Sequence, residues 1–111
     1  MNEPLDLDID VIRELSDDIV TVLKSLGNKD RLLILSLLVN EELNVSEIET
    51  KSQILQPTLS QQLMILRKNN IVTTRRSGKQ IFYSIKDQRF IKILNNIYHF
   101  HLTSSALSMT G

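Results

Sequence analysis

Two short runs of β-forming residues, joined by a two-residue turn, most strongly limit how this chain can fold. "IVTTRR" (71–76) and "QIFYSI" (80–85) are rich in β-branched and aromatic residues, and Ser77-Gly78 lies between them. Runs of this kind separated by such a turn predict a β-hairpin. The rest of the chain carries helical patterns, so the sequence predicts a mainly α (α+β) fold with one hairpin.

Five segments show the periodicity of helices, and they span residues 8–26, 28–40, 45–52, 57–69 and 88–102. Gly27 is a stop signal for the first helix. The second is apolar on nearly all sides, which predicts a central position. Asn44 and Glu47 form a capping-box pattern before the third. The 111 residues are expected to form one domain, 1–111, in which 1–7 and 104–111 are loose.

The helix predicted over 57–69 has an unusual exposed side. Leu59, Leu63 and Leu66 recur at i, i+4 and i+7 and form a narrow leucine stripe. The opposite side carries hydroxyl and amide groups, which can bond the edges of DNA bases. This pattern favours the recognition helix of a helix–turn–helix. The candidate base-reading residues are Thr58, Ser60 and Gln61, and the candidate contacts around them are Pro57, Gln62, Met64 and Lys68.

Cations surround the tip of the predicted hairpin. Arg75 and Arg76 precede the turn and Lys79 follows it, which suits a wing that holds DNA phosphates or enters a minor groove. The overall charge is uneven as well, because residues 1–50 carry four bases and twelve acids whereas 51–111 carry nine bases and one acid. A basic half favours a polyanionic partner.

Each of these patterns has a plainer explanation. Hydroxyls and amides near a helix start also serve as caps, and cations on a hairpin also keep it hydrated. The uneven charge would equally support head-to-tail self-association. A protein-interaction module, in which the same helix and basic wing dock on a protein partner, is therefore the alternative function. A preference for one operator over random duplex DNA by at least about 10³-fold would favour the DNA-binding interpretation.

The order helix, helix, helix–turn–helix, hairpin, helix describes a winged helix–turn–helix. On "RLLIL", "QPTLSQQL" (56–63) and "IVTTRRSGKQIFYSI" (71–85), the chain resembles the ArsR/SmtB family of dimeric winged-helix repressors. It is most similar to the branch of BigR and SqrR, which responds to reactive sulfur. The resemblance implies a homodimer that binds an inverted-repeat operator and catalyses nothing. It places the dimer contacts on the first and last helices, where the leftover apolar faces include Ile12, Ile19, Leu94, Ile97 and His101.

The sensing residues of that branch are absent. Ser36 and Leu102 occupy the positions of its two cysteines, and the chain contains no cysteine at all. Thiol-based sensing is therefore not expected. His99 and His101 lie about 200° apart on a helix, so one helix cannot direct both to one metal. We expect no metal and no cofactor, and the lack of a catalytic array argues against an enzyme.

Two further expectations concern the turn and the location of the protein. The family usually has glycine at the position of Gln53, where a left-handed conformation would cost a non-glycine residue about 1–2 kcal/mol. The longest apolar run, "LLILSLLV" (32–39), is too short to span a bilayer. A cytoplasmic, nucleoid-associated protein without a membrane partner is therefore expected.

Overall fold

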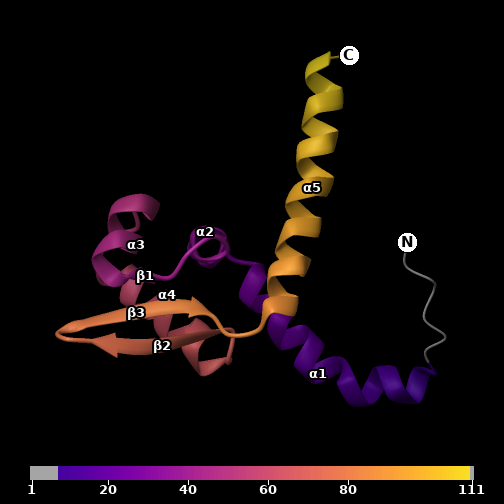
Figure 1. Ribbon diagram of the computed structural model, residues 1–111. Coiled ribbons are helices and arrows are strands. Elements are labelled where there is room, and N and C mark those ends of the chain that lie inside the picture. Colours follow the sequence, from indigo (N-terminus) through magenta and orange to yellow (C-terminus); the bar gives the residue numbers. More distant parts are fainter. Residues whose placement is uncertain (1–7, 111) are drawn as a thin grey trace.

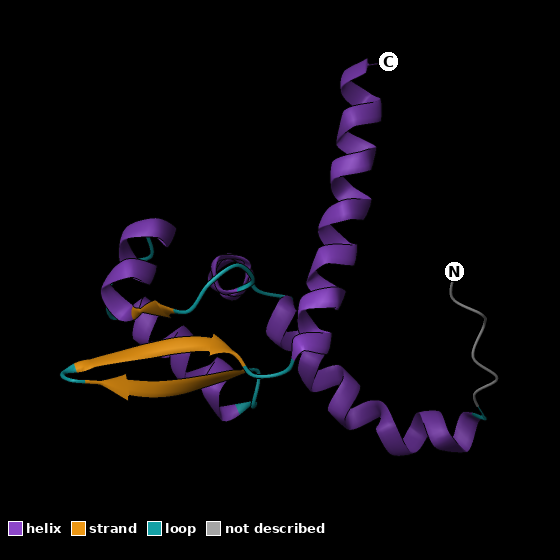
Figure 2. Cartoon of the chain, in the orientation of Figure 1, coloured by secondary structure: helices purple, strands orange, loops and turns teal. Residues whose placement is uncertain are grey.

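A computed structural model describes the backbone of residues 8–110 and the side chains of residues 8–102. Its elements are α1 (Ile9–Leu26), α2 (Lys29–Leu38), β1 (Leu43–Asn44), α3 (Val45–Ser52), α4 (Thr58–Lys68), β2 (Val72–Ser77), β3 (Gln80–Ile85) and α5 (Gln88–Thr110). Figure 1 shows α2, α3, α4 and the strands grouped together, with α1 and α5 extending away from them. The hairpin of β2 and β3 projects as a wing (Figure 2). Over the described residues, this arrangement confirms the predicted winged helix–turn–helix.

Polar caps determine where helices α1, α2 and α3 begin. The Asp8 and Asn28 side chains accept hydrogen bonds from backbone N–H groups in the first turns of α1 and α2. Asn44 and Glu47 form the predicted capping box of α3, with both side-chain-to-backbone bonds at 2.9 Å. Each bond satisfies a donor that has no partner inside its helix. These three helices consequently begin within one residue of the predicted positions.

Two non-glycine residues with positive φ follow helices α3 and α4. Asn70, at φ 60°, tolerates this conformation, and the N–H of Ile71 donates to the carbonyl of Leu66 at 3.0 Å in a Schellman motif. Gln53 ends α3 at φ 61°, and its N–H donates to the carbonyl of Glu49 at 2.9 Å. The left-handed turn considered at Gln53 is therefore present, and it carries the cost that glycine would avoid.

The sheet has three antiparallel strands in the order β1-β3-β2. The hairpin register pairs Arg75 with Phe82 and Ser77 with Gln80, and Gly78 takes φ +62° in the turn. Strand β1, which pairs Leu43 with Tyr83, was not predicted. It has two residues, too few to show an alternating pattern. Its pairing attaches the wing to the segment that leads into α3.

The core surrounds α2, as its apolar character predicts. This helix buries Ile34, Leu35 and Leu38, and the leucine stripe of α4 packs into the same cluster with no side chain more than 2% exposed. Leu94 of α5 is also in the core, at 0% exposure within one protomer. Leu94 was predicted to be a dimer contact, but the first half of α5 packs onto the domain and buries this side chain in the protomer's own core, so it is not available to a second copy.

Helix α5 begins as predicted but continues further. The Asp87 side chain accepts from the backbone N–H of Arg89 at 2.9 Å and caps the helix. Hydrogen bonds from the Arg89 side chain and backbone lower the pKa of Asp87 to about 2. The helix runs to Thr110, beyond its predicted end at residue 102. Residues 103–110 contain neither Gly nor Pro, so this stretch holds no helix-stopping residue. The looseness expected over 104–111 stays a prediction.

Residues 1–7, also expected to be loose, lie outside the described part of the chain. None of the helices in the described part combines the length and the apolar character that a membrane span requires.

Candidate nucleic-acid interface

The side of α4 that faces away from the core carries the predicted base-reading residues. Thr58, Ser60 and Gln61 are exposed, and Met64 is 64% exposed on the same side. Pro57 and Lys68, at the two ends of the helix, are exposed as well. Burial of the leucine stripe therefore directs a row of hydroxyl and amide groups outward. Such a row offers hydrogen bonds without the strong hydration of charged groups.

Gln56, a residue without a predicted role, stabilises the first turn of α4. Pro57 occupies the N-cap position and has no capping side chain. The side-chain oxygen of Gln56 instead accepts from the backbone N–H of Ser60 at 3.1 Å and from its hydroxyl at 2.6 Å. The Ser60 oxygen keeps its acceptor capacity. The only sequence signal for this role was an amide residue directly before the proline.

Gln62 lies on a different side of α4 from its neighbours. It is half-buried, and its side-chain oxygen accepts from Nη1 of Arg31 in α2 at 2.8 Å. The side-chain amide nitrogen of Gln62 is the group that can still donate a hydrogen bond to a bound partner. The structure thus separates Gln62 from the row formed by Thr58, Ser60 and Gln61.

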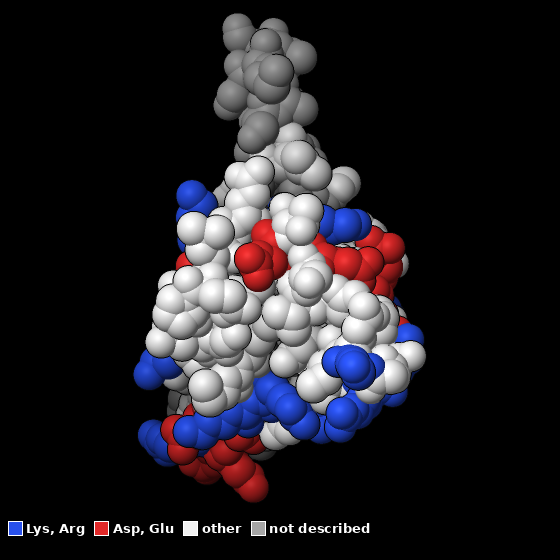
Figure 3. Space-filling model, turned by 90° about the vertical axis from the view of Figure 1, so that its left-hand side faces the viewer, with Lys and Arg blue, Asp and Glu red and all other residues white. Residues whose placement is uncertain are grey.

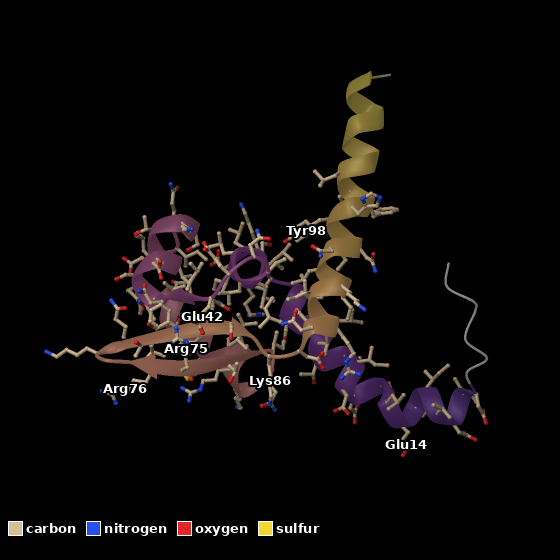
Figure 4. The ribbon with its side chains drawn as sticks, viewed as in Figure 1. Glu14, Glu42, Arg75, Arg76, Lys86 and Tyr98 are labelled. Atoms are coloured by element: carbon tan, nitrogen blue, oxygen red, sulfur yellow. The ribbon has the colours of Figure 1, made fainter. Side chains whose placement is uncertain are left out.

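The two arginines of the wing have different surroundings, as alternating strand positions require. Nε of Arg75 donates to both Glu42 carboxylate oxygens at 2.8 Å, and its guanidinium lies 4.7 Å from the centre of the Phe82 ring. The hydrogen bond to Glu42 raises the pKa of Arg75. Figure 4 shows Arg75 beside Glu42, whereas Arg76 points away on the other side of the wing. The charge of Arg75 is therefore compensated within the protomer.

The other cations of the wing lie close to its tip. Arg76 is exposed, and its Nε donates to the carbonyl of Gly78 at 3.2 Å. Lys79 is exposed at the turn itself. Figure 3 views the molecule from the side of the wing tip: much of the middle of this face is uncharged, Lys and Arg atoms gather in a band below it, and Asp and Glu atoms lie above the middle and at the lower edge. This face therefore has cations along its lower part, next to residues without charge.

A second surface lies on α1, which has an apolar row that the protomer leaves exposed. Ile12 and Ile19 are 39% and 48% exposed, and Leu23 is 59% exposed. Ser25 is the only buried residue of the helix. On α5, Ile97 is half-buried and His101 is exposed, with its ring edge against Phe100 at a centroid distance of 5.1 Å. These side chains form the candidate self-association surface.

Ser36 and Leu102, the positions expected to correspond to sensing cysteines, differ in their surroundings. The Ser36 hydroxyl donates to the carbonyl of Leu32 at 2.6 Å and shares a hydrogen bond with the hydroxyl of Tyr98. Leu102 is 68% exposed. Among the described side chains, no three His, Cys, Asp or Glu residues are grouped in a way that would hold a metal ion.

Comparisons with known proteins agree with this geometry. A family model described as "Bacterial regulatory protein, arsR family" matches residues 28–74. The biofilm growth-associated repressor of Agrobacterium fabrum is 36% identical over 101 residues, which cover 88% of this chain and 86% of that protein.

Solved structures match over most of the chain. The transcriptional repressor BigR from Xylella fastidiosa has a TM-score of 0.77 and 36% identity, with 85% of this chain and 96% of that chain covered. A homodimeric winged helix-turn-helix DNA-binding domain from Mycobacterium bovis has a TM-score of 0.71 and 30% identity, with 92% and 94% covered. That domain is described as a possible ArsR-family transcriptional regulator.

Proposed function

The chain belongs to the arsR family of bacterial regulatory proteins, and from this premise we propose that it is a transcriptional repressor. It binds double-stranded DNA as a homodimer at an inverted-repeat operator, and as a member of a family of regulators it is not an enzyme. The observation that carries the proposal is the exposed row of Thr58, Ser60 and Gln61 above the buried leucine stripe. A helix of this kind enters the major groove with its N-terminal residues at the base edges.

Each exposed residue has a distinct task in this proposal. Gln61 reads a base with its amide, and Thr58 and Ser60 contact bases with their hydroxyls. Arg76 and Lys79 hold phosphates and so fix the position of the wing without reading sequence. The remaining candidate contacts are Pro57, Gln62, Met64, Lys68 and Arg75, of which Arg75 contributes least because Glu42 already neutralises it.

The apolar row of α1 supplies the dimer contact. In the proposed dimer, Ile12 and Ile19 pack against a second copy together with Ile97 and His101 of α5. A two-fold dimer places two copies of α4 on one side of a duplex, which matches an inverted repeat. The protein needs no metal for this, and it acts in the cytoplasm, at the nucleoid.

Release from DNA does not use thiol chemistry in this proposal. A ligand shifts a repressor only through unequal affinity for its bound and free conformations. With Ser36 bonded to Tyr98 and Leu102 exposed, neither position supplies a nucleophile comparable to a thiolate.

The test begins with selection of bound fragments from random duplex DNA. Affinity for the selected sequence and for unrelated duplex is then measured at about 150 mM salt, because electrostatic binding depends on the salt concentration. A repressor prefers the selected site by at least about 10³-fold, and that site contains an inverted repeat. Retention of all duplexes with similar weak affinity would contradict the proposal.

A further inference from the structure

One arginine joins the helix of the self-association surface to the recognition helix. Arg31 lies in the first turn of α2 and is half-buried. Its Nε and Nη2 donate to the carbonyls of Ser25 and Lys24 at the end of α1, both at 3.0 Å. Its Nη1 donates to the side-chain oxygen of Gln62 in α4 at 2.8 Å. A single guanidinium therefore bonds α1 and α4 at the same time.

A second bond connects the same two helices. The side-chain nitrogen of Asn69, at the end of α4, donates to the Ser25 hydroxyl at 3.2 Å. That hydroxyl donates to the carbonyl of Thr21 at 2.9 Å, and Ser25 is only 1% exposed. Ser25 is also the one buried residue of α1. The junction between α1 and α4 thus depends on directed polar contacts, which we call the polar link (Arg31, Ser25, Gln62 and Asn69).

The chemistry of this link requires arginine. The last carbonyls of a helix lack full partners inside it, and here the Arg31 side chain bonds two of them, the carbonyl of Ser25 and the carbonyl of Lys24, which also accepts from the N–H of Gly27 at 3.2 Å. A guanidinium is a rigid planar fork with five donors, so it can bond three acceptors in fixed directions. Lysine carries the same charge on a flexible stem with one nitrogen and cannot reproduce that geometry.

We propose that Arg31 is a positioning residue that sets the distance between the two recognition helices of the dimer. This inference rests on the proposed function, in which α1 contacts the second copy and α4 reads the half-site. In the dimer, α1 is held in place by its contact with the second copy. The polar link orients α4 relative to α1, and it therefore also fixes the distance between the two copies of α4. Because half-site spacing in such dimers mirrors that distance, the polar link determines which operator spacing is accepted.

A measurement without DNA tests the geometric step. The chain has no cysteine, so Arg67→Cys, at an exposed position in the last turn of α4, gives one spin-label site per copy. Pulsed electron resonance then reports the distance between the labels in the dimer. Arg31→Lys is expected to broaden the distance distribution about twofold, because lysine cannot hold three acceptors in place. The control is Arg13→Lys, the same substitution at an exposed arginine of α1 that forms a salt bridge with Asp10. This variant is expected to leave the distance distribution unchanged.

Substitutions at Gln62 provide an independent variant if Arg31→Lys lowers stability. Gln62→Leu removes the acceptor and is expected to broaden the distribution, whereas Gln62→Glu retains it and keeps the distribution narrow. An unchanged width in both Arg31→Lys and Gln62→Leu would overturn the proposal.

A measurement with DNA tests the functional step. Operators with one base pair inserted or deleted between the half-sites are compared with the selected operator. The unmodified protein is expected to prefer the selected spacing by about tenfold or more, and Arg31→Lys by about threefold or less, with random-DNA affinity unchanged. A full spacing preference in Arg31→Lys would contradict the positioning role. If the unmodified protein binds all duplexes equally, the proposed function is contradicted. The label distances measured without DNA would then still decide whether Arg31 positions α4.

Discussion

Helices α1 and α4 each leave a long side uncovered within the protomer, and the two sides differ in chemistry. On α4 the leucine stripe is buried in the core, and hydroxyl and amide groups are exposed to solvent. On α1 an apolar row stays outside, with Ile19 48% and Leu23 59% exposed. Directed donors and acceptors suit a hydrated partner such as DNA, whereas an apolar row suits a partner that removes it from water. The kind of group exposed, more than exposure itself, distinguishes the two surfaces.

The largest expected effect follows from placing a charge on the apolar row. Ile19→Asp should raise the dissociation constant of the dimer at least about hundredfold, because an unpaired buried charge costs about 3 kcal/mol or more. Sedimentation equilibrium measures this constant. Thr21→Asp places the same carboxylate on the polar side of α1 and should leave the dimer intact. A folded monomer of the unmodified chain at high concentration would contradict the assignment of α1.

A smaller effect is expected on the polar side of α4. Gln61→Ala should cost about 1–3 kcal/mol on the selected operator and relax the preference at one base pair, because the amide that is proposed to read the base is lost. The measurement is titration of operator and random duplex with the variant. Gln88→Ala, an exposed glutamine at the start of α5, serves as the control. Equal losses on both duplexes would remove Gln61 from the base-reading set.

The wing should show an effect that is independent of sequence. Arg76→Ala and Lys79→Ala should weaken all duplexes alike and reduce the slope of log affinity against log salt by about one unit each. Arg75→Ala should reduce it less, because Glu42 and Phe82 already hold that guanidinium. Affinities at several salt concentrations give the slopes, and Arg13→Ala on α1 is the control. Unchanged slopes for Arg76→Ala and Lys79→Ala would place the wing away from DNA.

The smallest expected effect concerns sulfur chemistry. Treatment with a persulfide donor should leave operator affinity unchanged, because no thiol is present. Peroxide acts differently if it oxidises Met64, which is 64% exposed on α4, since a polar sulfoxide then lies on the side of α4 that is proposed to face DNA. Binding should weaken while the dimer persists. A loss above about tenfold with the persulfide donor, without methionine oxidation in the mass spectrum, would reveal another sensing chemistry.

Local patterns predicted most of the fold and the exposed side of α4. The leucine stripe, the capping box of Asn44 and Glu47, and the turn at Ser77-Gly78 each depend on residues a few positions apart. Such signals are contained in a short stretch of sequence. They also gave the order of the elements, which is sufficient to recognise a winged helix–turn–helix.

Contacts between distant residues were not predictable in the same way. The bonds from Arg31 to Gln62 and from Arg75 to Glu42 join residues 31 and 33 positions apart, and no periodicity connects them. Leu94 illustrates a related limit. Periodicity places it on an apolar face of α5, but it does not say whether the chain's own core or a second copy covers that face. In the structure Leu94 is 0% exposed within one protomer, so the chain's own core covers it.

The uncovered apolar row of α1 links operator occupancy to the amount of protein in the cell. If only the dimer binds DNA and most chains are monomeric, the dimer concentration follows the square of the monomer concentration, so about a twofold rise in chains gives about a fourfold rise in dimer. By the same mass action, the melting temperature should rise with protein concentration. The abundance of the chain would then act as a regulatory input of its own, one that requires neither a metal nor a thiol.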